Sequence, residues 1–99
     1  MGRERKRLSM FEERIYIYNR DMGVCQHCGT EVSMDDFQVA HRIAQTKSNV
    51  KKWGRSVIDH PLNKAATHGG ACNDGMNIGF NPVESAALVE TILNDADTP

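Results

Sequence analysis

Residues 24–29 read VCQHCG, and a second motif, HGGAC, runs from His68 to Cys72. In the first motif a tight turn between Cys25 and Cys28 points its backbone amides at the sulfurs, so two thiolates can converge on one cation. The second motif can supply a further pair of ligands. Together the four side chains would form a closed tetrahedral Cys₃His site that uses all three cysteines of the chain. The pattern therefore predicts a structural zinc ion.

Other interpretations of these residues stay open. A CxxC pair also occurs in thioredoxin-like redox sites, but there it follows a strand, whereas a predicted helix precedes it here. Cys72 by itself could be a small buried hydrophobic residue. His60 competes with His68 as the fourth ligand, while His27 lies inside the first knuckle and is expected to point outward. Zinc is the interpretation that explains the odd number of cysteines.

The size and composition of the chain favour one domain with a thin core. The chain has 99 residues, of which 39% are hydrophobic and 6% aromatic. In zinc-finger peptides a metal site contributes ~10 kcal/mol or more of apparent folding free energy, which would support such a core. The net charge of −1 argues against a chain kept disordered by charge. Because no membrane-length apolar run and no apolar stretch after the basic start occur, we expect no membrane partner, no secretory signal and a cytoplasmic location.

Local patterns predict an α+β fold with few strands in a single domain over residues 1–99. Residues 8–20 are typical of a helix that Ser9 caps, with Glu12 in the capping-box position. In chain order we further expect a tight turn at 24–29, a loop at 30–36, a strand at 37–44, a polar loop at 45–56, a short extended piece at 57–58, a helix from Pro61 to about Thr67, and a helix at 82–94 with Pro82 in its first turn.

Basic residues are clustered although the net charge is close to zero. Residues 41–55 contain five basic side chains and no acidic one. Residues 1–20 also have a basic excess, with six basic against three acidic side chains, whereas residues 82–99 contain four acidic side chains and no basic one. A polyanion such as DNA would bind the first two regions and avoid the third.

The order of these pieces is typical of a known family. A helix ending at Arg20 leads into the CQHCG knuckle, a strand carries His41, a basic loop follows, Asn63 lies near a helix start, and the second knuckle ends in Cys72-Asn73. Over about residues 12–78 this order resembles the HNH endonucleases in their zinc-stapled form. The resemblance implies a small zinc-stapled treble-clef (ββα-metal) domain with flanking helices, and an enzyme that hydrolyses phosphodiester bonds in DNA, most simply double-stranded DNA.

The resemblance also implies roles for individual residues. His41 matches the general base that activates water, and Asn63 matches the asparagine that holds the loop and orients that histidine. Asn73 matches a ligand of the catalytic divalent metal, for which Mg²⁺ or Mn²⁺ suits an amide oxygen. His68 departs from the family, where a cysteine is usual. The basic residues that follow His41 would contact DNA phosphates, namely Arg42, Lys47, Lys51, Lys52 and Arg55.

Ala40 is a more serious departure from the family. An acidic residue or a histidine usually stands immediately before the general base and binds the catalytic metal, and alanine has no ligand atom. Asp74, which follows Asn73, is one candidate replacement, and Asp59 and His60 are others. The sequence does not choose among them.

Two functions of different classes therefore remain from the sequence. The first is a metal-dependent DNA endonuclease with His41 as general base. The second is a catalytically weak zinc module that binds DNA, an interpretation that Ala40 keeps open. A pair such as His41 and Asn63 favours the nuclease, because a binding module needs neither residue. Since so little surface lies beyond the nuclease core, we do not expect a monomer to recognise a long site, and a homodimer or larger nuclease assembly stays open.

Overall fold

The computed structural model describes residues 8–96 and residue 98, and these form helices around one small sheet. In chain order the elements are α1 (Met10–Arg20), β1 (Gln38–His41), α2 (Lys47–Trp53), α3 (Arg55–Ile58), the 3₁₀ turn η1 (Pro61–Asn63), β2 (Lys64–Thr67), α4 (Ala71–Gly75) and α5 (Pro82–Asn94). This composition confirms the predicted α+β class. None of the helices in the described part of the chain combines the length and the apolar character that crossing a bilayer requires.

The first and last helices begin where their own sequences predict. The Ser9 hydroxyl accepts a hydrogen bond from the Glu12 backbone N–H at 3.1 Å, and the Glu12 carboxylate accepts one from the Ser9 N–H at 3.0 Å. This reciprocal pair is the predicted capping box. Pro82 occupies the first turn of α5, as predicted, and the preceding Asn81 caps that helix by accepting from two backbone N–H groups.

Residues 45–56, which the sequence predicts to be a polar loop, are mostly helical. Thr46 caps α2, and Gly54, with φ at +91°, separates α2 from α3. Val57 and Ile58, predicted to be extended, lie in α3 and are buried. The prediction was wrong because α2 has one weak apolar face, and its helical form depends on packing of Val50 and Trp53 against the distant α5 cluster.

The predicted helix from Pro61 to Thr67 is also wrong beyond its first turn. Pro61 does begin a helical turn, as proline at that position favours, but the 3₁₀ turn ends at Asn63 and the chain becomes β2. The strand pairs antiparallel with β1, with His41 opposite Lys64 and Gln38 opposite Thr67. Lysine and alanine favour helices, so pairing with β1 overrides the local preference of this segment.

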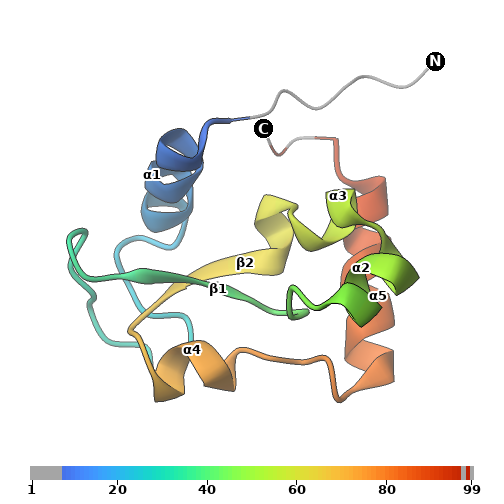
Figure 1. Cartoon of the computed structure of the whole chain (residues 1–99). Coiled ribbons are helices and arrows are strands. Elements are labelled where there is room, and N and C mark those ends of the chain that lie inside the picture. The colour runs from blue at the N-terminus through green and yellow to red at the C-terminus, as the bar shows by residue number, and fades with distance from the viewer. Residues whose placement is uncertain (1–7, 97, 99) are drawn as a thin grey trace.

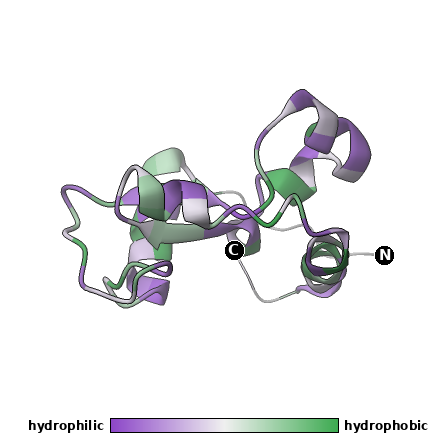
Figure 2. Ribbon diagram, turned by 90° about the horizontal axis from the view of Figure 1, so that it is seen from below, coloured by the Kyte–Doolittle hydropathy of each residue, from purple (hydrophilic) through white to green (hydrophobic). Residues whose placement is uncertain are grey.

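The elements are layered around the sheet. Helix α1 lies on one side of the β1–β2 pair and α4 on the other, while α2, α3 and α5 gather at one end (Figure 1). In Figure 2, seen from below, α4 lies nearest the viewer and the largely hydrophilic α2 projects from the side of the molecule. One buried cluster lies under α5 and comprises Ile43, Val57, Ile58, Val89 and Ile92. A second lies under α1 and comprises Ile17, Val32, Phe37 and Ala66.

Candidate functional site

The four predicted zinc ligands lie together. The ligand atoms of Cys25, Cys28, His68 and Cys72 are all within 4.8 Å of one another, so the cluster could hold a structural metal ion. Cys25 and Cys28 belong to the turn that follows α1, His68 directly follows β2, and Cys72 lies in α4. The backbone N–H of Gln26 donates to the Ala66 carbonyl at 2.9 Å, which fastens the first knuckle to β2 beside the second.

The imidazole of His68 is oriented as a metal ligand needs. Its Nδ1 lies 3.4 Å from the Cys28 Sγ, and its Nε2 lies 3.0 Å from the Glu31 carbonyl oxygen. A carbonyl can only accept, so Nε2 carries a hydrogen, and Nδ1 is the ring nitrogen that faces the sulfurs and would ligate a metal when it is deprotonated. Such an outer hydrogen bond sets the tautomer of a ligating histidine. The Glu31 carbonyl is a contribution that no side-chain pattern in the sequence could have revealed.

Electrostatics in the cluster favour a bound cation. Burial alone would raise the pKa of the Cys25 thiol, but hydrogen bonds from the backbone N–H groups of Cys28, His68 and His27 lower this pKa to about 6. Burial and the neighbouring sulfurs of Cys25 and Cys28 raise the pKa of Cys72 to about 11. The three sulfurs therefore cannot all become thiolates near neutral pH by themselves. A divalent cation would offset the repulsion between neighbouring thiolates and allow all three sulfurs to ligate.

The competing histidines lie elsewhere. His60 is buried, its Nδ1 accepts from the Leu62 backbone N–H at 3.1 Å, and its Nε2 lies 3.4 Å from an oxygen of Asp95 near the end of α5. His27 is exposed, as expected for a residue inside the knuckle, and does not belong to the cluster. The geometry therefore favours His68 as the fourth ligand.

Asn63 closes the long connection between the two strands. The side chain is fully buried; its Oδ1 accepts from the Ile43 N–H at 2.8 Å, and its Nδ2 donates to the carbonyls of Ile43 at 3.0 Å and Ile58 at 2.8 Å. The Asn63 carbonyl also accepts from the Arg42 N–H at 2.8 Å. Because these bonds take the backbone groups of Ile43, β1 ends at His41, earlier than the strand predicted at 37–44.

His41 opens into a pocket of about 320 Å³ between the sheet and α1. Its Nε2 atom is buried and has no hydrogen-bond partner among the described residues. Burial and the Lys64 ammonium lower the pKa of His41, against the smaller opposing effects of Asp59 and Glu13. The imidazole is therefore neutral at pH 7 and can accept a proton. The pocket is lined by Met10, Glu13, Arg14, Val39, His41, Gln45, Asp59 and Lys64.

The residues expected to bind a catalytic divalent metal do not meet His41. Side chains alternate along a strand, so Gln38 and Ala40 face α4 while His41 faces α1. Asn73 on α4 donates from Nδ2 to the Gln38 Oε1 at 3.0 Å, and Ala40 is fully buried. Neither Asn73 nor Asp74 lines the His41 pocket.

The alternative acidic or histidine ligands do not complete a second metal site either. Asp59 lines the His41 pocket, and one of its carboxylate oxygens lies 3.7 Å from the Arg55 guanidinium. His60 does not line that pocket and lies beside Asp95. Within the described residues, the Cys₃His cluster is the single group of three or more His, Cys, Asp or Glu side chains arranged to hold an ion. The residues present therefore do not fit a catalytic Mg²⁺ or Mn²⁺ in the His41 pocket.

Four of the five predicted DNA-contacting residues are exposed on α2 and at the start of α3, and we call this group the α2 surface. It comprises Lys47, Lys51, Lys52 and Arg55. The Lys52 ammonium lies 4.8 Å from the centre of the Trp53 ring. Arg42 does not belong to this surface; it is partly buried and lines a different pocket, of about 360 Å³, with Arg20 and Met76. The basic residues among the first seven lie outside the described residues.

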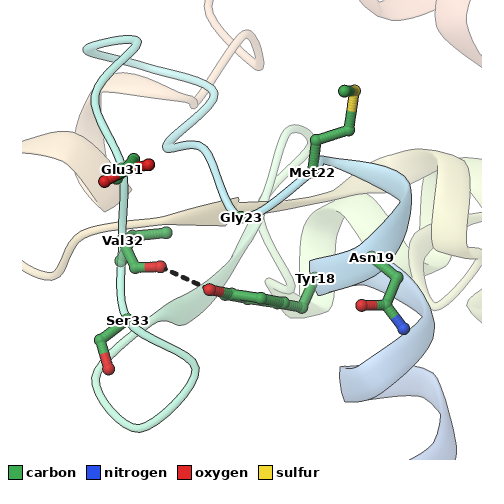
Figure 3. A pocket seen from close by; sticks show the side chains of 7 residues that line it. All are labelled: Tyr18, Asn19, Met22, Gly23, Glu31, Val32 and Ser33. Carbon is green, nitrogen blue, oxygen red and sulfur yellow. Dashed lines mark hydrogen bonds between the residues drawn. The ribbon is translucent and has the colours of Figure 1, made fainter.

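A further pocket, of about 610 Å³, lies between the end of α1 and residues 31–33 but offers little chemistry (Figure 3). Tyr18 lies along its floor and donates from its hydroxyl to the Val32 carbonyl at 2.8 Å. The acidic residue in its lining is Glu31, whose carbonyl supports His68. A tyrosine hydroxyl engaged in this way and one carboxylate do not make an acid–base pair, so the smaller His41 pocket is the stronger candidate.

Comparison with known proteins assigns no relative. No family model matches the chain, and neither a curated protein nor a solved structure matches it. The function is therefore inferred from the residues and their geometry.

Proposed function

We propose that this chain is a zinc-stabilised endonuclease that hydrolyses phosphodiester bonds in double-stranded DNA, on a treble-clef (ββα-metal) scaffold of the HNH type. The order of elements supports the scaffold. A Cys-x-x-Cys knuckle is followed by the antiparallel β1–β2 pair and then by α4, and the second ligand pair stands between β2 and the middle of α4. One ion would join the beginning and the end of this unit.

Zinc is the ion that this donor set favours. Thiolate and imidazole ligands select zinc over Mg²⁺ and Ca²⁺, and four protein ligands leave no open position for a substrate. The site at Cys25, Cys28, His68 and Cys72 is therefore structural. Its free energy of binding would stabilise the fold directly.

The unpartnered Nε2 of His41 carries the proposal of catalysis. A buried polar atom without a partner costs about 1–3 kcal/mol, so a histidine with a purely structural role normally finds a hydrogen bond. Here the buried Nε2 is unpaired among the described residues, beside a pocket that also presents Lys64 and Asp59. A water molecule that reaches Nε2 from the pocket through a small side-chain shift would satisfy this atom and could lose a proton to it.

In the proposed reaction, His41 acts as the general base. His41 accepts a proton from the water, the water oxygen bonds to phosphorus, and the bond from phosphorus to the 3′ oxygen breaks. The leaving oxygen takes a proton from solvent, which yields a 5′ phosphate and a 3′ hydroxyl. Asn63 anchors the chain directly after His41 through Ile43 and Arg42 and so restricts the movement of the base. No step is assigned to a catalytic metal, because its expected ligands lie across the sheet from His41.

DNA would be held by the α2 surface. Its four cations, Lys47, Lys51, Lys52 and Arg55, are exposed and follow β1 in the chain. Phosphate contacts of this kind provide affinity without sequence preference. The same surface, together with the buried Ala40, favours the second candidate, a DNA-binding zinc module without cleavage.

A plasmid-nicking assay with Mg²⁺, Mn²⁺ or EDTA separates the two candidates. If His41 is the general base, His41→Ala should keep the zinc, the fold and the DNA affinity, while cleavage falls by ~10²–10⁴, or ~3–5 kcal/mol of transition-state stabilisation. The exposed His27 offers a matched control, since His27→Ala removes an imidazole outside the pocket. Full activity in His41→Ala would refute the mechanism, and binding without cleavage by the unmodified chain would establish the DNA-binding module instead.

A further inference from the structure

The candidate general base has a cationic neighbour directly across the sheet. Lys64 on β2 is the register partner of His41 on β1, and both side chains line the pocket beside α1. Residues opposed in this way have Cβ atoms ~4.5–5.5 Å apart. An anion that approaches His41 from the pocket therefore approaches Lys64 as well.

Lys64 is held in position instead of moving freely in solvent. Its side chain is 11% exposed, and its Nζ lies 2.5 Å from the Oε1 of Glu13 on α1. The Lys64 carbonyl accepts from the Arg20 guanidinium at 2.6 Å, which also fixes the backbone at this point. An ammonium has three donor hydrogens, and Glu13 engages one of them. Two donors remain for an anion in the pocket.

Hydrolysis of a phosphodiester needs such a positive charge. As the water oxygen attacks, negative charge grows on the non-bridging oxygens of the phosphoryl group. Ala40 is buried and has no ligand atom, and Asn73 is bonded to Gln38 on the opposite side of the sheet. Arg14, the other cation of the pocket, is stacked on the Phe37 ring at 3.9 Å. Lys64 is thus the pocket cation that the sheet aligns with His41.

We propose that Lys64 binds the scissile phosphate beside His41 and stabilises the charge that develops on its non-bridging oxygens, with Glu13 holding the ammonium in position. This inference rests on the proposed function. Lys64 would be a catalytic residue that keeps its protons throughout, and Glu13 a positioning residue. The bonds that form and break are those of the proposed reaction, and Lys64 interacts with the phosphate only electrostatically.

Four variants test this assignment in steady-state cleavage of duplex DNA. Lys64→Met keeps the aliphatic stem and should lower kcat by ~10²–10³, the usual effect of removing one charge-stabilising donor, with a smaller change in KM. Lys64→Arg should recover part of the loss. Glu13→Gln leaves the ammonium in the pocket and should retain at least a tenth of kcat, and the Glu13→Gln/Lys64→Met double variant should behave like Lys64→Met. Glu90→Gln on the exposed face of α5 is the control for loss of one negative charge.

Two results that differ from these expectations would overturn the proposal. If each single variant loses activity and urea stability equally and the double variant recovers both, the pair is merely structural. If Glu13→Gln abolishes cleavage and weakens the apparent affinity for Mn²⁺, Glu13 is a metal ligand and Lys64 its counter-charge.

DNA binding measured without divalent metal keeps this test separate from the proposed function. Because Lys64→Met removes one cation from the phosphate, it should reduce the log–log salt slope of duplex binding by ~0.9. If the unmodified chain cleaves nothing with any metal, the proposed endonuclease fails, and the salt slope alone decides whether Lys64 binds phosphate. An unchanged slope would overturn the assignment of Lys64.

Discussion

The Cys₃His cluster and the His41 pocket differ in how completely their polar groups are satisfied. In the cluster, the sulfurs of Cys25 and Cys28 accept from backbone N–H groups, and the Nε2 of His68 is paired with the Glu31 carbonyl. In the pocket, the buried Nε2 of His41 has no partner within the described residues. Satisfied groups stabilise a fold, whereas an unsatisfied one in a cavity is a cost that the rest of the structure must offset. We infer that the cluster serves stability and the pocket serves reactivity.

Removing a ligand of the cluster should have the largest effect. Cys25→Ser removes a buried sulfur from the site. We expect loss of the zinc and an unfolded or aggregating chain, because the metal contributes ~10 kcal/mol or more in comparable sites. Metal analysis and far-UV circular dichroism measure the two effects. A folded, zinc-free wild-type protein would contradict the structural role, and intact zinc in His68→Ala would show that the fourth ligand is a different residue.

Removing the anchor of the connection between β1 and β2 should have an intermediate effect. Asn63→Ala deletes three buried side-chain hydrogen bonds, to Ile43 twice and to Ile58. At about 1 kcal/mol for each bond, the free energy of unfolding should fall by ~3 kcal/mol, with the zinc content unchanged. Urea denaturation measures this change. An unaffected midpoint would show that Asn63 does not hold the connection between β1 and β2.

The pH dependence of cleavage should further distinguish the reactive His41 pocket from the structural cluster. Burial and Lys64 lower the pKa of His41 below its ordinary value of 6.5. Because the neutral imidazole is the active form, the rate should be constant above pH 6.5 and fall only as the pH drops below it. The stability linked to His41 should fall over the same range, since the unfolded chain then binds the proton more readily than the folded chain. A rate still rising between pH 7 and 8 would exclude His41 as the titrating base.

Changes on the α2 surface should have the smallest effect and spare both regions. Lys51→Glu with Lys52→Glu alters exposed side chains of α2. Binding should weaken across all DNA sequences, and the log–log salt slope should fall by ~0.9 for each phosphate that the variant no longer neutralises. Fluorescence anisotropy at several salt concentrations measures the slope. An unchanged slope would place the DNA elsewhere on the protein.

The sequence was sufficient where chemistry depends on short spacing. A thiol pair with two residues between its members needs only a turn to converge, and His68 with Cys72 needs only a short bend, so the composition of the cluster followed from the two motifs. The start of α1 at Ser9 was predictable for the same reason, since a capping box involves residues three positions apart.

Tertiary contacts decided the rest. Residues 64–67 form a strand because β1 lies beside them, and residues 47–53 form a helix because Val50 and Trp53 reach the cluster under α5. With 61–67 predicted as helix, the pairing of Lys64 with His41 could not be foreseen, and neither could the approach of Glu13 from α1. The sequence by itself indicated the two candidate ligand pairs and the class of the fold, because local spacing is enough for each, while the structure brought the pairs together and favoured His68 over His60. Which groups surround His41, and that Asn73 lies across the sheet from it, depended on strand register and side-chain alternation, which arise only when distant segments pack together.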